Sequence, residues 1–259
     1  MKVRWHLALM LFAAASAGAA TASRAPVPAG TFETILPPAP GVQSATVQAF
    51  AMDVVPVTNA DFARFVASHP QWRRDRVARV FADAGYLRHW AGDAAPAPGT
   101  TRQPVTRVSW FAANAYCEAQ GARLPTWYEW ERVSAADPSR ADARSDPAWR
   151  QQILDWYARP AGDTLPDVGR GPPNYFGVRD IHGLVWEWVQ DLGSMMVSGD
   201  NREQGDPDTL RFCGSGALTL EQKDNYAMLM RIATLSSMQA SYTSSTMGFR
   251  CVAGPEPAP

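Results

Sequence analysis

The sequence is nearly devoid of lysine, has no excess of charge of either sign and contains no long apolar run. Lys2 and Lys223 are its two lysines, and 24 basic against 25 acidic residues give a formal charge of −1 over 259 residues. Nucleic-acid affinity depends on a surplus of basic groups that contact phosphates, so we expect no nucleic-acid partner. A membrane-spanning helix needs about 20 apolar residues, and no segment reaches that length, so we expect no membrane partner for the mature protein.

The N-terminus has the composition of a secretory signal peptide. Lys2 and Arg4 form its positive end, a short apolar stretch follows, and Ala17-Gly18-Ala19 is a small-x-small cleavage site. We therefore predict a signal peptide over 1–19, a single domain over 20–259, and a periplasmic or secreted protein. The alternative interpretation is an N-terminal helix that belongs to the fold.

Cysteine is scarce, and export changes how the three cysteines are interpreted. An oxidising compartment permits disulfides, and Cys117, Cys213 and Cys251 allow one disulfide with one thiol left over. The count alone does not say which cysteine is left.

Helix signals dominate the first two thirds of the chain, and short β-type runs follow within irregular loops. Ser109 is placed to cap one helix, and Thr126 with Glu129 forms a capping box for the next. We predict helices from 58–59 to before Pro70 and at 110–120, 127–136 and 147–158, and strands at 30–36, 184–189, 229–234 and 249–252. This order is typical of one α+β domain with much loop, not of alternating βαβ units.

Five strings of residues resemble the formylglycine-generating enzyme (sulfatase-modifying factor) family, in the family's order. They are Val57-Thr58-Asn59-Ala60, Val108-Ser109-Trp110, Gly121-Ala122-Arg123-Leu124-Pro125-Thr126, Trp186-Glu187-Trp188 and Gly248-Phe249-Arg250-Cys251-Val252. The resemblance implies the family's variant of the C-type-lectin fold. That variant is an α+β fold with little regular secondary structure around a small twisted antiparallel sheet, supported by calcium.

The chain departs from the family at the residues that carry the oxidase chemistry. Formylglycine generators bind copper through a cysteine pair that precedes an Arg-x-Ala-x-x-Ser-Ser run, which here is residues 231–237. Between Gly214 and Met230 there is no cysteine, and Thr246 replaces a family asparagine. Copper(I) requires soft thiolate ligands. We therefore expect that formylglycine is not generated, and we leave open whether the chain is an enzyme.

Other strings resemble exported accessory proteins associated with copper nitrite reductase. They are Tyr86-Leu87-x-His89-Trp90, Gly183-Leu184-Val185-Trp186-Glu187-Trp188 and Phe212-Cys213-Gly214-x-Gly216-Ala217-Leu218. The leading hypothesis is an accessory or maturation factor for a periplasmic redox metalloenzyme such as copper nitrite reductase, with a polypeptide partner bound near Trp186 and Cys213. The alternatives are a metal-dependent oxidase that uses Cys213 and a lectin-like ligand-binding module.

The resemblance also implies roles for individual residues. It places calcium on the Asp180 and Glu187 side chains and the Gly183 and Val185 carbonyls, against the alternative of an acidic turn before a buried tryptophan strand. It pairs Cys117 with Cys251 in a disulfide.

For the remaining candidate residues and cofactors, several interpretations stay open. Cys213 is a soft-metal ligand, a handle for a mixed disulfide, or a small buried core residue. Trp186 is the candidate wall of a binding groove, while the neighbouring tryptophans are expected in the core. Copper or iron stays open as a cofactor, and His69 with His89 and a carboxylate is the one arrangement that suits iron.

Overall fold

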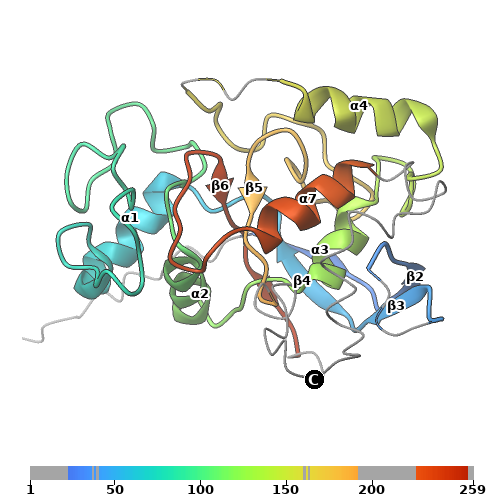
Figure 1. The fold of residues 1–259 in the computed structure, drawn as a ribbon, viewed down its shortest axis with the longest axis horizontal. Helices are drawn as coiled ribbons and strands as arrows, with labels where there is room; N and C mark the ends of the chain where they lie inside the picture. Colours follow the sequence, from blue (N-terminus) through green and yellow to red (C-terminus); the bar gives the residue numbers. More distant parts are fainter. Residues whose placement is uncertain are drawn as a thin grey trace, which may run out of the picture.

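The computed structural model describes residues 23–36, 38, 41–159, 162, 164–191 and 226–255 (Figure 1). Short helices and short strands are joined by long loops, and the strands form small sheets of two or three strands. The predicted α+β class with little regular secondary structure is confirmed. Within these residues, no helix has the length and apolar character needed to cross a bilayer.

A three-stranded antiparallel sheet brings the two ends of the described chain together. The strand β4 (Phe50–Asp53) lies between β1 (Arg24–Val27) and β7 (Val252–Ala253), and β2 (Gly30–Glu33) pairs with β3 (Ser44–Val47). The strand predicted at 30–36 is thus shorter, and β1, β3 and β4 were not predicted. Four residues are too few to show a clear alternation of apolar and polar side chains.

The predicted helices in the first two thirds of the chain are confirmed. They are α1 (Asn59–Ser68), α2 (Trp110–Ala119), α3 (Trp127–Ser134) and α4 (Pro147–Tyr157). The hydroxyls of Thr58, Ser109 and Thr126 accept from backbone N–H groups in the first turns of α1, α2 and α3. The short 3-10 helix η1 (Pro70–Trp72) follows α1. Local capping chemistry therefore sets where these helices begin.

The strand predicted at 229–234 is wrong, because this segment belongs to the helix α7 (Tyr226–Ser236). Met228, Arg231 and Leu235 are buried at a spacing of three and four residues, which is the helical period. The β-branched Ile232 and Thr234 led to the strand prediction, but burial of one helix face outweighs their preference.

The other predicted strands are shorter or shifted. Within the strand predicted at 184–189, only β5 (Trp186–Glu187) forms. It pairs in parallel with β6 (Met247–Gly248). The strand β6 ends directly before the strand predicted at 249–252. The pairing places Trp186 opposite Met247. Figure 1 shows β5 and β6 side by side next to α7.

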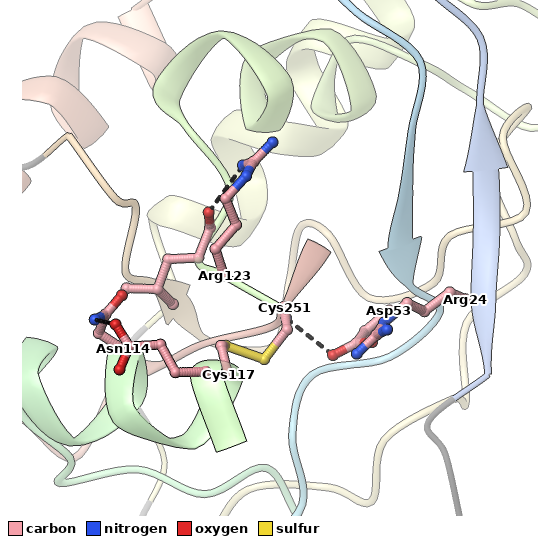
Figure 2. Close-up of a disulfide and its surroundings, with 8 residues drawn as sticks. Arg24, Asp53, Asn114, Cys117, Arg123 and Cys251 are labelled. Atoms are coloured by element: carbon pink, nitrogen blue, oxygen red, sulfur yellow. Dashed lines mark hydrogen bonds and ion pairs between the residues drawn. A yellow bond between two sulfur atoms is a disulfide. The ribbon is translucent and has the colours of Figure 1, made fainter. Parts of the chain in front are cut away.

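The disulfide that the resemblance implies is present and ties α2 to the end of the chain (Figure 2). Cys117 and Cys251 are fully buried, with Cα atoms 5.5 Å apart and a separation of 134 positions in the sequence. The backbone N–H of Cys251 donates to the Asp53 carboxylate, which also accepts from Arg24. A stable disulfide of this kind is typical of an oxidising, extracytoplasmic compartment.

Candidate functional site

The carboxylate of Glu187 on β5 is enclosed by an arginine and a tryptophan in the interior. Arg250 Nη2 donates to Glu187 Oε1 at 2.8 Å, and Arg250 Nε lies 3.0 Å from both oxygens. Trp130 Nε1 donates to Oε2 at 2.9 Å. Both charged side chains are fully buried. The ion pair is therefore bidentate and completed by a neutral donor, as a buried pair requires.

Arg250 also connects three other parts of the fold. Its guanidinium donates to the carbonyl oxygens of Asp53, Val54 and Arg179, at 3.0, 3.3 and 3.0 Å. The side chain thus holds the end of β4, the segment before the Asp180 turn and β5 against the C-terminal segment.

A second buried guanidinium fastens α7 over β5. Arg231 lies with its Cζ 3.5 Å from the centre of the Trp130 ring, and its Nη2 donates to the Glu187 carbonyl. Burial lowers the pKa of Arg231 to about 10, so the side chain is charged at neutral pH. Arg231 begins the Arg-x-Ala-x-x-Ser-Ser run, and its observed contacts are a cation–π interaction and a carbonyl hydrogen bond.

The two carboxylates of the predicted calcium site already have hydrogen-bond partners within the described fold. The oxygens of Glu187 are taken by Arg250 and Trp130, and the Asp180 carboxylate accepts from the backbone N–H groups of Gly169 and Gly171. Within the residues that the structure describes, no three Asp, Glu, His or Cys side chains gather as a metal cluster, whereas the predicted calcium set has two carboxylates and two backbone carbonyls. Arg250 supplies the positive charge that Glu187 would otherwise receive from calcium, and the ligand set stays a prediction of the resemblance.

Removing calcium is therefore expected to leave the stability unchanged. We expect EGTA to shift the thermal unfolding midpoint by less than about 2 °C, a shift that corresponds to under 1 kcal/mol for a chain of this size. Differential scanning calorimetry with EGTA, and then with excess CaCl2, makes the comparison. A midpoint that falls by several degrees and recovers on addition of calcium would contradict the expectation.

Trp186 occupies a half-buried aromatic cluster at the end of α4. Its ring centre lies 5.0 Å from that of Tyr157 and 5.9 Å from that of Trp156. By contrast, Trp127, Trp130 and Trp188 are fully buried, as expected for core residues. Trp186 is partly exposed, and its role as a groove wall stays a prediction.

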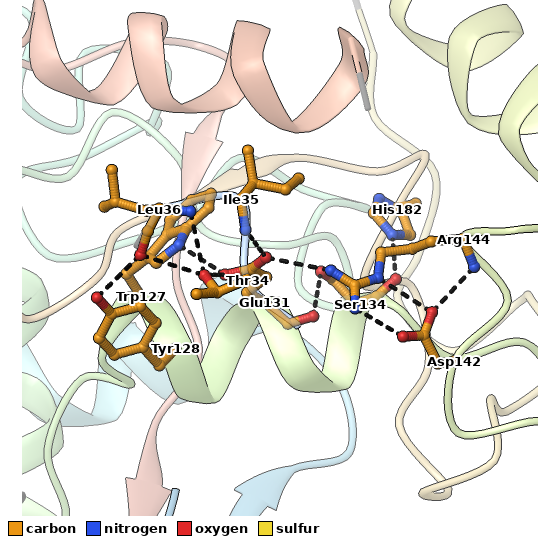
Figure 3. Close-up of polar contacts among 10 residues, drawn as sticks. All are labelled: Thr34, Ile35, Leu36, Trp127, Tyr128, Glu131, Ser134, Asp142, Arg144 and His182. Carbon is orange, nitrogen blue, oxygen red and sulfur yellow. Dashed lines mark hydrogen bonds and ion pairs between the residues drawn. The ribbon is translucent and has the colours of Figure 1, made fainter. Parts of the chain in front are cut away.

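A second buried carboxylate, Glu131 on α3, anchors the segment after β2 (Figure 3). It accepts from Thr34 Oγ1 at 2.6 Å, the Ile35 N–H at 2.9 Å and Trp127 Nε1 at 2.9 Å, and Arg144 lies 3.3 Å away. All of its neighbours are structural donors, so this carboxylate holds the fold together and is not available for chemistry.

His182 lies next to this network and is held in its neutral form. Its Nε2 lies 2.8 Å from the Ser134 carbonyl and must be the protonated nitrogen, while the buried Nδ1 has no hydrogen-bond partner in the described part of the chain. Burial, and to a lesser degree the positive charges of Arg231 and Arg250, lowers the pKa of His182 to about 4. A proton on Nδ1 would face no acceptor.

This geometry predicts a loss of stability in mild acid. In the unfolded protein His182 binds a proton below its ordinary pKa of about 6.5. In the folded protein its pKa is about 4, so it stays neutral until the pH falls to about that value. Stability is therefore lost as the pH falls from 6.5 towards 4. Between pH 7 and 5, the free energy of unfolding should fall by about 1–2 kcal/mol more in wild type than in His182→Gln. Parallel pH profiles of urea unfolding for the two proteins would refute the assignment.

A cavity that was not predicted opens between the loop after η1 and the loop after α7. Its volume is about 520 Å³, and it is lined by Asp83, Ser237, Met238, Gln239, Ser241 and Tyr242. The two loops are joined because Asp83 donates its N–H to the Ser241 carbonyl and accepts from the Thr243 N–H through its carboxylate. Gly85 is required there, since a Cβ would lie 2.5 Å from Thr243 Oγ1.

The sequence analysis did not identify this cavity, and a single weak signal could have indicated it. Phe81 is an aromatic residue within an arginine-rich stretch that otherwise reads as exposed loop. Cys213, the other candidate of the sequence, lies outside the described residues, so its position relative to the cavity and to Trp186 stays a prediction.

Comparison with known proteins supplies the family. A model of the sulfatase-modifying factor enzyme 1-like domain matches residues 13–254. An inactive C-alpha-formylglycine-generating enzyme 2 from Bos taurus is 29% identical over 251 residues, which cover 82% of this chain and 80% of that protein. Hercynine oxygenase from Mycobacterium tuberculosis is 34% identical over 164 residues, covering 55% of this chain and 38% of the oxygenase. The crystal structure of CarF superposes with a TM-score of 0.50 at 16% identity, covering 91% of this chain and 99% of CarF, which shows a shared fold.

Proposed function

The chain belongs to the sulfatase-modifying factor family, and from this premise we propose that it is an exported member without formylglycine-generating activity. In this proposal it binds a polypeptide and assists the maturation of a periplasmic redox metalloenzyme, with copper nitrite reductase as the client.

The proposed absence of formylglycine-generating activity rests on the number of cysteines and on how they are paired. The sequence has three cysteines, and Cys117 and Cys251 are joined in a buried disulfide. One thiol remains, whereas the family's copper site requires two thiolates, and copper(I) is poorly held by oxygen ligands. The relatives do not decide this point, because one of them is named as inactive and another as a formylglycine-generating enzyme.

The cavity beside Asp83 and the partly exposed Trp186 support polypeptide binding. The cavity combines apolar Met238 and Tyr242 with hydroxyl and amide groups, which suits a backbone with apolar side chains. Trp186 is linked to the same loop, because its N–H donates to the Thr246 carbonyl.

Copper nitrite reductase is chosen as the client because several sequence strings resemble the accessory proteins associated with that enzyme. In one of them Tyr86, Leu87 and Trp90 are buried, with the Tyr86 hydroxyl donating to the Trp72 carbonyl and Trp90 Nε1 to Asn59. That string therefore supports a shared fold, and the client itself must be identified by experiment.

Co-production with the client tests the proposal. We expect copper nitrite reductase exported together with this protein to contain more copper and to turn over nitrite faster than the same enzyme exported alone. Equal copper content in both preparations would overturn the maturation role.

A second experiment tests the absence of formylglycine generation. When a sulfatase peptide that contains a cysteine is incubated with the purified protein, the cysteine should remain a thiol. Detection of the aldehyde by mass spectrometry would overturn the claim of inactivity. Copper or iron bound stoichiometrically and lost in Cys213→Ser would overturn the accessory role and favour the metal-dependent oxidase instead.

A further inference from the structure

Large apolar side chains are exposed beside the cavity. Among the described residues six large hydrophobic side chains are exposed, and Val80 (69%), Phe81 (43%) and Tyr242 (45%) are three of them. They lie on the two loops that Asp83 joins to each other. The ring of Phe81 rests against Phe111, with centres 5.4 Å apart, so it is held in place while it faces solvent.

The same loop carries positive charge that the described fold does not neutralise. Arg73 pairs with Asp75 and Arg74 pairs with Asp93. Arg76 and Arg79 are exposed and have no ion pair within the described residues, and Arg79 directly precedes Val80 and Phe81. Most other arginines that the structure describes are either paired with a carboxylate or bound to a carbonyl. We call Arg76, Arg79, Val80, Phe81 and Tyr242 the Phe81 surface.

We infer that the Phe81 surface binds an acidic segment of a partner protein whose apolar side chains enter the cavity beside Asp83. The inference rests on the proposed polypeptide-binding function and adds the chemistry of the partner. Carboxylates of the partner would pair with Arg76 and Arg79 at the rim, where complementary charge sets the association rate and the specificity. Phe81 and Tyr242 would supply the apolar contacts that carry most of the affinity.

A lipid surface explains the cavity less well than a polypeptide does. The cavity is lined by Asp83 together with Ser237, Gln239 and Ser241, whose hydroxyl and amide groups can hydrogen-bond to the N–H and C=O groups of a peptide backbone. The Asp83 carboxylate accepts from the Gly85 N–H and from the N–H and hydroxyl of Thr243, so its hydrogen-bonding capacity is used within the fold.

Fluorescence anisotropy with two labelled peptides tests the inference. In one peptide phenylalanine and leucine alternate with glutamate and aspartate, and in the other lysine replaces each acidic residue. We expect the acidic peptide to bind at least about tenfold more tightly than the basic one, a difference that corresponds to about 1.4 kcal/mol, and its affinity to fall with added salt.

Matched variants assign the binding to this surface. We expect Phe81→Ala and Arg76→Glu/Arg79→Glu each to weaken the acidic peptide about tenfold or more. Tyr175→Ala and Arg159→Glu/Arg170→Glu change exposed residues outside this surface and should bind as wild type does. Circular dichroism and the thermal midpoint confirm that each variant is folded.

The other outcomes overturn the inference, and they differ from a failure of the proposed function. Equal binding of both peptides, or loss of binding in Trp186→Ala but not in Phe81→Ala, rejects an acidic partner at this surface and leaves polypeptide binding intact. Binding to vesicles of phosphatidylglycerol with no binding of either peptide assigns the surface to lipid. Copper loading of the client that is independent of this protein rejects the proposed function, whichever peptide binds.

Discussion

Replacing Arg250 with methionine should lower the free energy of unfolding by about 3–5 kcal/mol, because it leaves the buried carboxylate of Glu187 without its cation. Trp130 would then be the one remaining side-chain donor that the structure records for this carboxylate. The carbonyls of Asp53, Val54 and Arg179 would lose their shared donor as well. Urea unfolding followed by tryptophan fluorescence measures the loss, since the chain contains ten tryptophans.

Two comparisons separate this effect from a general loss of an arginine. Arg73→Met removes a pair with Asp75 in which both side chains are more than a third exposed, and should destabilise the protein far less than Arg250→Met, because solvent screens exposed ion pairs. The double variant Arg250→Met/Glu187→Leu removes both buried charges, and should be less destabilised than the two single changes added together. Equal losses in Arg250→Met and Arg73→Met would show that the interior pair contributes no more than a surface pair.

Short-range chemistry was readable in the sequence, and this explains which elements were predicted. Thr58, Ser109 and Thr126 mark helix starts through bonds to residues three positions away. The helix α7 was missed because burial of Met228, Arg231 and Leu235 against distant parts of the chain decides its conformation.

The candidate site depends on contacts that no spacing reveals. Glu187 and Arg250 are 63 residues apart, and Asp83 and Thr243 are 160 residues apart. The resemblance supplied Glu187 as a ligand but not the guanidinium that occupies its oxygens. The cavity beside Asp83 exists only once two distant loops are joined, so the sequence alone gave Phe81 no special meaning.

Opening the Cys117–Cys251 disulfide should cost about 2–5 kcal/mol of stability and lower the thermal midpoint by about 4–20 °C. The bridge closes a loop of more than 130 residues, and the chain-entropy estimate for so long a loop is close to the upper end of that range. Its position reinforces the effect, because the N–H of Cys251 donates to Asp53 on β4 and Val252 exchanges backbone hydrogen bonds with Arg123. Loss of the bridge would loosen the strand that closes the three-stranded sheet.

Reductant provides the control for this prediction. The variant Cys117→Ala/Cys251→Ala should unfold at the lower temperature with or without tris(2-carboxyethyl)phosphine, whereas wild type should move to that temperature only when reduced. The Cys213→Ser variant keeps the bridge, so it should respond to the reductant as wild type does. If the reductant lowered the midpoint of the double alanine variant as well, its stability would depend on an intermolecular disulfide between the Cys213 residues of two molecules, because Cys213 is the one cysteine left in that variant. If wild type kept its midpoint after full reduction, confirmed by thiol labelling of all three cysteines, the connection between α2 and β7 would be maintained by packing and hydrogen bonds alone.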